Sequence, residues 1–217
     1  MGKQFHQELE ALRGRVLEMG AKSRLNVVEG VRSLVEGDTD LAGRVIARRD
    51  ELNRLDVELE RDALDLLALN QPVAQDLRTI GASLKIITYI DRIGRYGYDL
   101  AKITREMGVR EPAAKKPVTL GVMAEHAMAM LDAALTAYKE RDGPKARAVG
   151  PQDEVVDALY EQMFRTTVTM MMEDPRTITR GAHLILAARH LERCADNASK
   201  IAEKALYMAT GERRLPV

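Results

Sequence analysis

Cysteine and tryptophan are almost missing from this chain of 217 residues, which has one cysteine, no tryptophan and only two phenylalanines. The single cysteine, Cys194, excludes an intrachain disulfide framework and any zinc site built from several cysteines. A chain without disulfides is typical of a reducing compartment. The sequence therefore predicts a cytoplasmic protein.

An excess of charge is missing too, because 33 Lys and Arg residues balance 33 Asp and Glu residues. Proteins that bind nucleic acids need a surplus of positive charge to contact phosphates, so we expect no such partner. We also expect no apolar run of the roughly 18 residues that a membrane-spanning helix needs. The opening MGKQFHQ continues into charged sequence and does not resemble a signal peptide. These features predict neither nucleic-acid binding nor membrane insertion.

The residues that are abundant favour helices. Alanine, leucine, methionine, glutamate, arginine and lysine are good helix formers, whereas the aromatic residues that favour strands make up only 4% of the chain. Apolar residues also recur at steps of three and four, which is the spacing of one face of an amphipathic helix. A clear example is the series Leu52, Leu55, Leu59, Ala63 and Leu66. The sequence predicts an all-α protein.

Turn signals divide this helical material into six helices. The breaks are expected at 37–40, 70–72, 108–118, 142–144 and 173–175, where glycine, proline, asparagine and aspartate gather. Pro72 is expected at the first position of the third helix, and Asp174 is expected to cap the sixth. Gly150 and Pro151 fall inside the fifth helix, where proline removes a backbone donor. We predict a kink or a restart there.

The two halves of the sequence look like copies of one unit. ITYIDRIGRYGYDLAKI in the first half has a counterpart in AARHLERCADNASKIAEKA in the second, with Asp91 and Glu192 in equivalent places. A duplicated three-helix unit is the simplest interpretation. We predict two tandem antiparallel three-helix bundles, with the first at 1–107, a linker at 108–118 and the second at 119–217.

Acidic residues spaced four apart are the main candidates for a site. Asp153 and Asp157 form one such pair, and Glu192 and Asp196 form another after the apolar residues of the same helix row. Facing rows of carboxylates favour a hard cation such as Mg²⁺, Mn²⁺ or Ca²⁺, and iron is also compatible. The alternative is a solvated helix face whose acids pair with neighbouring arginines.

The sequence contains no recognisable catalytic arrangement. It has neither a Glu-x-x-His pair for a di-iron site nor a glycine-rich phosphate loop nor a Gly-x-Ser-x-Gly turn. His190 is a single helical histidine, a residue type that is more often structural than reactive. We therefore expect a protein that is not an enzyme.

The duplicated segments also carry a family resemblance. The first half contains ALDLLALNQPVAQDLR followed by YIDRIGRYGYDLAKI, and the second contains DEVVDALYEQMF, MMMEDPRTITR and ARHLERCADNASKIAE. With these motifs the chain resembles the PhoU family along nearly its whole length. The resemblance implies a cytoplasmic, non-catalytic adaptor that restrains the phosphate regulon. Its implied partners are the ATPase of the phosphate ABC transporter and the phosphate-sensing histidine kinase, and a homo-oligomer such as a homodimer is also expected.

The resemblance further implies metal binding through Glu/Asp-x-x-x-Asp motifs. In the second half Glu192 with Asp196 matches this motif, and Asp153 with Asp157 supplies a second pair. The expected metals are Mn, Mg or Fe.

The first half departs from this motif. Asp91 matches the leading acid there, but Arg95 replaces the acid that should follow, and Arg49 precedes Asn53. Only Asp56 and Glu60 remain as a carboxylate pair. We expect an Asp91–Arg95 ion pair and a weakened or lost first site.

Two other functions stay open at this point. The chain could be an accessory subunit of a different phosphate or cation transporter, since related helical proteins serve there. A metal-dependent enzyme built on the acidic rows is less favoured, because no base or nucleophile accompanies the carboxylates.

Overall fold

The computed structural model describes residues 2–108 and 117–212, and within these ranges every regular element is helical. The first half contains α1 (Lys3–Glu36), α2 (Thr39–Ala47), α3 (Arg49–Asn70) and α4 (Ala74–Met107). The second half contains α5 (Val118–Glu140), α6 (Gly143–Arg147), α7 (Asp153–Glu173) and α8 (Ile178–Thr210). Short 3₁₀ turns, η1 (Gly150–Gln152) and η2 (Pro175–Thr177), precede α7 and α8. The predicted all-α class is confirmed.

Both halves break their second long helix. The break before α7 lies at Gly150 and Pro151, as the sequence predicts. The corresponding break between α2 and α3, at Arg48, was not predicted. Arg48 reaches back to α1, where its guanidinium binds the carboxylate of Glu29 and the side-chain oxygen of Asn26. Arg48 itself keeps helical φ and ψ angles of −73° and −12°, and these contacts hold its side chain against α1 at the point where α2 ends and α3 begins.

Some expected helix ends differ in detail. Pro72 lies before α4, which begins at Ala74 after Val73, so it does not occupy the first helical position. Asp174 does accept a hydrogen bond from the backbone N–H of Arg176, and it therefore caps the 3₁₀ turn that leads into α8. α5 begins at Val118, the last residue of the predicted linker, and 109–116 lie outside the described residues.

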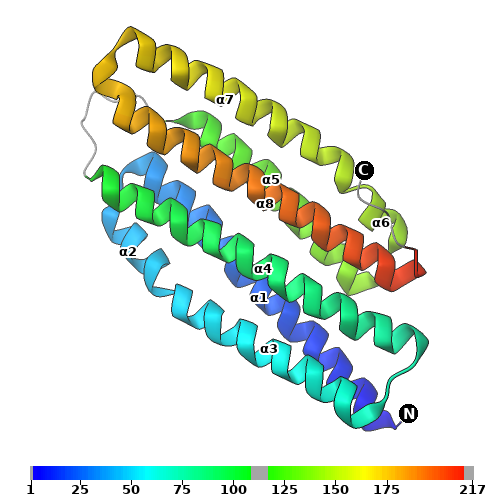
Figure 1. Cartoon of the computed structure of the whole chain (residues 1–217). Coiled ribbons are helices and arrows are strands. Elements are labelled where there is room, and N and C mark those ends of the chain that lie inside the picture. The colour runs from blue at the N-terminus through cyan, green and yellow to red at the C-terminus, as the bar shows by residue number, and fades with distance from the viewer. Residues whose placement is uncertain (1, 109–116, 213–217) are drawn as a thin grey trace.

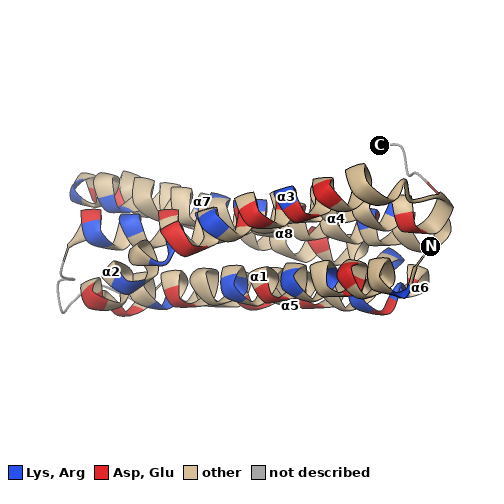
Figure 2. Ribbon diagram, turned by 90° about the horizontal axis from the view of Figure 1, so that it is seen from below, with Lys and Arg blue, Asp and Glu red and all other residues tan. Residues whose placement is uncertain are grey.

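The long helices run side by side, with α4 and α8 in the middle and α3 and α7 on the two outer sides (Figure 1). α1 and α5 lie together along one side of the molecule, away from α3 and α7 (Figure 2). α4 packs on α8 and α1 packs on α5, so one hydrophobic core runs through both halves. The division of the chain into two separate bundles at 1–107 and 119–217 stays a prediction.

α5 corrects one sequence expectation. Its length and composition are sufficient for a membrane span, although no such run was expected, and half of that apolar stretch is buried inside the molecule. Most of its buried residues belong to the shared core, and its carboxyl end is held by Arg13, whose Nη2 donates to the carbonyl of Tyr138 at 2.9 Å. A core helix of this kind passes the same test of composition.

Candidate functional site

The acidic residues of the second half lie on the facing helices α7 and α8, and we call Asp153, Asp157, Glu192 and Asp196 the acidic cluster. The row that leads to it on α8 begins with the buried residues Leu184 and Ala188. Glu192 continues this row and is only 9% exposed. The carboxylate of Glu192 therefore lies close to the apolar contact between α7 and α8.

The electrostatics of the acidic cluster show that its members act on one another. The pKa of Asp153 is raised to about 6, first by burial and then by the charges of Asp157 and Asp196. The pKa of Glu192 is also raised, first by burial and then by Asp196, while Arg189 and Arg193 oppose the shift. Charge has therefore been concentrated between α7 and α8 at a cost that a bound cation would remove.

Arginines partly neutralise the cluster. Arg189 Nη1 donates to Glu192 Oε1 at 2.6 Å, and Arg193 Nη1 donates to Asp196 Oδ2 at 2.9 Å. These contacts match the surface-pair alternative. Two buried carboxylate oxygens, Asp153 Oδ1 and Glu192 Oε2, nevertheless have no hydrogen-bond partner among the described residues, although Arg193 Nε lies 3.8 Å from Glu192 Oε2.

The donor set of the acidic cluster consists of carboxylate oxygens, which suit hard cations. As the side chains stand, no three Asp, Glu, His or Cys residues among 2–108 and 117–212 are grouped to hold a metal ion. The residues present therefore fit a metal in kind. To bind one, the carboxylates would have to turn towards each other and leave their arginines.

The first half has a different centre. Arg49, at the start of α3, binds Asp91 of α4 through Nη1 to Oδ1 at 2.7 Å and Nη2 to Oδ2 at 3.1 Å. The expected ion pair between Asp91 and Arg95 is therefore wrong, since the cation comes from the facing helix. A bidentate pair between two helices is better oriented than one along a single helix.

The charges of Asp91 and Arg49 affect the pKa of the neighbouring Asp56. Its pKa is raised first by burial and then by the charges of Asp91 and Glu60, while Arg49 lowers it. The structure thus brings Asp56, Glu60 and Asp91 within electrostatic reach of each other, with a fixed guanidinium among them.

Arg49 is the residue whose role the sequence analysis missed. It is the first residue of α3, as Asp153 is the first residue of α7. Asn53 and Asp157 then follow four residues later in the two helices. The duplication was the signal that could have found this correspondence, because it sets Arg49 where the second half has an acid.

The other candidate residues have structural environments. The ring of His190 stacks on Tyr96 of α4, with centroids 5.6 Å apart, and burial lowers its pKa. Cys194 is fully buried, and burial raises the pKa of its thiol. Met171 packs against Gly181, where an added Cβ would lie 2.7 Å from Met171 Cγ. His190 and Met171 thus take part in contacts between helices, and Cys194 belongs to the hydrophobic core.

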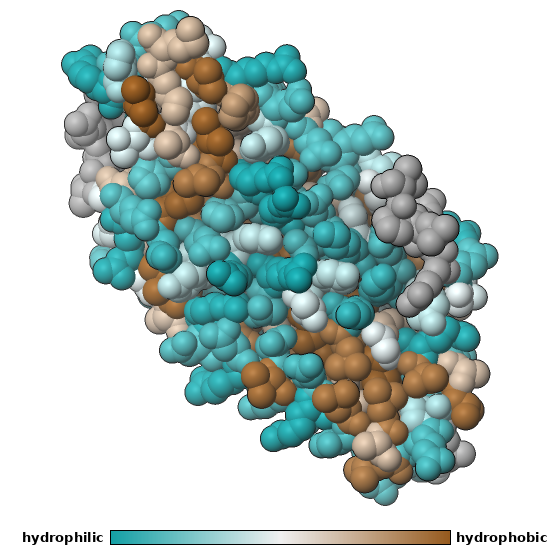
Figure 3. All heavy atoms as spheres, viewed as in Figure 1, coloured by the Kyte–Doolittle hydropathy of each residue, from teal (hydrophilic) through white to brown (hydrophobic). Residues whose placement is uncertain are grey.

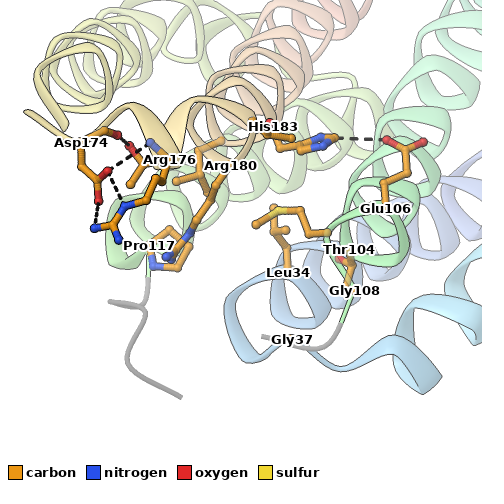
Figure 4. A pocket seen from close by; sticks show the side chains of 14 residues that line it. Leu34, Gly37, Thr104, Glu106, Gly108, Pro117, Asp174, Arg176, Arg180 and His183 are labelled. Atoms are coloured by element: carbon orange, nitrogen blue, oxygen red, sulfur yellow. Dashed lines mark hydrogen bonds and ion pairs between the residues drawn. The ribbon is translucent and has the colours of Figure 1, made fainter. Parts of the chain in front are cut away.

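A separate pocket of about 620 Å³ lies between the ends of α1 and α4 and the start of α8 (Figure 4). Asp174 and Arg176 bind one another on its rim, with Arg176 Nε 2.9 Å from Asp174 Oδ1. His183 Nδ1 lies 3.9 Å from Glu106 Oε2 across the pocket. Its charged side chains are therefore mixed in sign.

The face shown in Figure 3 is polar across its middle and apolar towards two opposite ends. Exposed apolar residues lie at the corner between α3 and α4, where Leu69 and Val73 are 81% and 68% exposed. Others lie at the corner between α7 and α8, where Met172 is 79% exposed.

Comparison with known proteins decides the family. A family model described as the PhoU domain matches residues 16–104 and again 120–205. The chain belongs to the PhoU family. The two matches place one PhoU domain in each half, as the duplication suggests.

Named relatives extend the PhoU match over nearly the whole chain. A protein of Rhizobium meliloti named phosphate-specific transport system accessory protein PhoU homolog is 37% identical, covering 95% of this chain and 87% of the relative. The protein of the same name from Zymomonas mobilis is 34% identical and covers 97% of this chain and 89% of the relative.

Solved PhoU structures share the fold. The crystal structure of PhoU from Pseudomonas aeruginosa superposes with a TM-score of 0.91 at 32% identity, covering 96% of this chain and all of that one. The phosphate transport system regulatory protein PhoU from Streptococcus pneumoniae has a TM-score of 0.89 at 24% identity over 98% of this chain and all of that one, which speaks for the fold alone.

Proposed function

We propose that this PhoU-family chain regulates phosphate uptake and phosphate signalling as a cytoplasmic adaptor without catalytic activity. It would connect the ATPase of the phosphate ABC transporter to the phosphate-sensing histidine kinase and restrain the phosphate regulon when phosphate is ample. The observation that carries this proposal is the pair of PhoU-domain matches, together with relatives that are named phosphate-transport accessory proteins.

The proposal includes a metal-binding role for the second half. Asp153, Asp157, Glu192 and Asp196 would hold Mn²⁺, Mg²⁺ or iron, which would supply positive charge between α7 and α8. The two carboxylate oxygens that have no hydrogen-bond partner among the described residues and the raised pKa of Asp153 support this role. In the first half Arg49 already supplies the cation to Asp91, so that half would hold metal weakly or not at all.

Self-association also belongs to the proposal. The chain would act as a homo-oligomer in the cytoplasm.

The adaptor role is tested in the native host. The gene is deleted, and a phosphate-regulon reporter is measured in high phosphate with the wild-type chain or the Glu192→Ala/Asp196→Ala variant restored. We expect the deletion to raise reporter activity and the wild-type chain to return it to the low state. A deletion that leaves the reporter low in high phosphate would contradict negative regulation.

Physical partnership needs a second measurement. The tagged wild-type chain is captured from the same host, and the transporter ATPase and the sensor kinase are detected with specific antibodies. We expect both in the captured material. Capture of a different transporter in place of these two proteins would favour the alternative, an accessory subunit of another uptake system.

A further inference from the structure

A groove of about 440 Å³ runs between α1 and α5 on a face that the acidic cluster does not use. We call it the α1–α5 groove. It is lined by apolar residues along its length and by four charged residues at its edges; the lining is Arg24, Val28, Val31, Arg32, Val35, Gly121, Ala124, Glu125, Met128, Ala129 and Asp132.

The apolar part of the groove is only partly covered by this chain. Val31, Ala124 and Met128 form its buried floor, whereas Val28 on its wall is 37% exposed. Val122, on the exposed side of α5, is also 37% exposed. Single exposed apolar residues are ordinary on a protein surface, so Val28 counts towards an interface only as part of the apolar lining of the groove.

The charges of the groove are sorted by helix. Its α1 edge carries Arg24 and Arg32, and its α5 edge carries Glu125 and Asp132. Arg24 Nε lies 2.9 Å from Asp132 Oδ2, which sets these two residues at one level. α1 and α5 are antiparallel, since Arg13 meets the far end of α5 at Tyr138.

The antiparallel arrangement also predicts which residues lie side by side further along the groove. Eight residues along α1 and seven back along α5 rise by about 12 Å and 10 Å. Arg32 therefore lies level with Glu125. Arg32 has Glu36 of its own helix 3.4 Å away, and Glu125 forms no ion pair with another residue of the described ranges.

A surface with a basic edge and an acidic edge at equal levels is complementary to itself. A two-fold axis parallel to the helices would set α1 of one copy over α5 of the other without shifting either along its length. Arg32 would then face Glu125 of the second copy, and Arg24 would face its Asp132. The apolar floors of the two grooves would meet between them, as in the core of a four-helix bundle.

We propose that the α1–α5 groove is the surface on which two copies of this chain associate. The inference rests on the proposed self-association and not on the adaptor role or on metal binding. The lining of the groove runs from Gly121 to Asp132 on α5, which is about 18 Å, so an interface of standard size would extend beyond the groove along both helices. A standard interface buries about 800 Å² per partner.

The test is a charge exchange measured by sedimentation equilibrium of the full chain in EDTA. Arg32→Glu places two acids opposite each other on both sides of the two-fold axis, and Glu125→Arg places two bases there. We expect either variant alone to raise the dissociation constant of the dimer by about tenfold or more. Mixing the two variants should restore a heterodimer of near wild-type affinity, because each new acid then faces a new base.

Val28→Glu tests the apolar wall of the groove by the same measurement, and Val57→Glu on the exposed side of α3 is its matched control. We expect the first to dissociate the dimer and the second to leave it intact. Circular dichroism of each variant establishes that it is folded, and recovery in the mixture would itself require folded chains.

Two results would overturn the inference, and they are distinguishable. A wild-type chain that stays monomeric at its highest soluble concentration would remove the proposed self-association and the groove with it. A dimer that is indifferent to the charge variants and to Val28→Glu would leave self-association in place on another face. Binding of the groove to a helix of a different protein, with no dimer, would also overturn it.

Discussion

Arg49 holds Asp91 through two hydrogen bonds, Nη1 to Oδ1 at 2.7 Å and Nη2 to Oδ2 at 3.1 Å. Both side chains are mostly buried, with 18% and 21% exposed. In the second half the first residue of the equivalent helix is an acid, Asp153, and Glu192 stands in the place of Asp91. Each half therefore has a carboxylate between two helices, Asp91 in the first and Glu192 in the second. The first residue of the neighbouring helix is a base, Arg49, in the first half and an acid, Asp153, in the second.

We expect the second half, with Asp153 in place of an arginine, to bind metal and the first half not to bind it. We expect Mn²⁺ to bind the metal-stripped chain in isothermal titration, and Glu192→Ala/Asp196→Ala to abolish the binding because it removes half of the oxygen donors. The matched variant in the first half, Asp56→Ala/Glu60→Ala, should bind as the wild type does. Equal losses in the two double variants would show that both halves hold metal and would contradict the role given to Arg49.

Removal of Arg49 should destabilise the chain. Arg49→Met leaves the carboxylate of Asp91 without its partner between α3 and α4, and we expect the free energy of unfolding to fall by about 1–2 kcal/mol. Arg49→Met with Asp91→Leu should recover most of this loss, because no charge is then left unpaired. Urea denaturation measures both variants.

An exposed pair provides the control for Arg49. Arg165 is paired with Glu161 at 2.5 Å on the surface of α7, with 77% and 65% of their side chains exposed. Arg165→Ala should change the free energy of unfolding by no more than about 0.5 kcal/mol. If the two arginine variants cost the same, the Arg49–Asp91 pair would be an ordinary surface pair.

Asp153 should make stability depend on pH. Its pKa of about 6 in the folded chain lies above the ordinary 3.8, so between these values the folded state binds more protons than the unfolded state. Stability from this group is therefore present below pH 4 and is lost as the pH rises to 6. In EDTA, Asp153→Asn should stabilise the chain at pH 7.5 by about 1 kcal/mol, allowing for solvent screening.

The same comparison at pH 4 is the check. Wild type and Asp153→Asn should be nearly equal in urea denaturation there, because the wild-type carboxyl is then protonated in the folded state. A gain that is the same at both pH values would mean that the amide stabilises by packing, and that Asp153 is not held at a cost.

Close contact between α1 and α4 should make Gly97 irreplaceable. A Cβ at Gly97 would lie 2.5 Å from the backbone carbon of Asn26 and 2.7 Å from the nitrogen of Val27. Because backbone cannot move aside as a side chain can, we expect Gly97→Ala to lower the free energy of unfolding by about 3 kcal/mol.

Gly81 on the same helix is the matched control, since an added Cβ there meets nothing within 4 Å. Gly81→Ala should raise the free energy of unfolding by about 0.5–1 kcal/mol through helix propensity. Thermal or urea unfolding measures both substitutions, and a tolerated Gly97→Ala would show that α1 can move away from α4.

The sequence by itself determined the all-α class, the duplication and most helix ends. The helical period of Leu52, Leu59, Ala63 and Leu66 reappears as buried residues of α3, because side chains three or four apart share one face whatever packs against it. Gly150 and Pro151 marked the break before α7 because proline acts on the backbone locally.

Tertiary structure alone decided which charges meet. The break at Arg48 is not marked by glycine or proline, and the contacts of Arg48 with Glu29 and Asn26 of α1 form only in the folded chain. Arg49 and Asp91 are 42 residues apart, and only the packing of α3 on α4 makes them partners in place of Asp91 and Arg95. Spacing along one helix identifies neighbours on that helix, whereas an ion pair between helices depends on their relative register, which is set by the shared core.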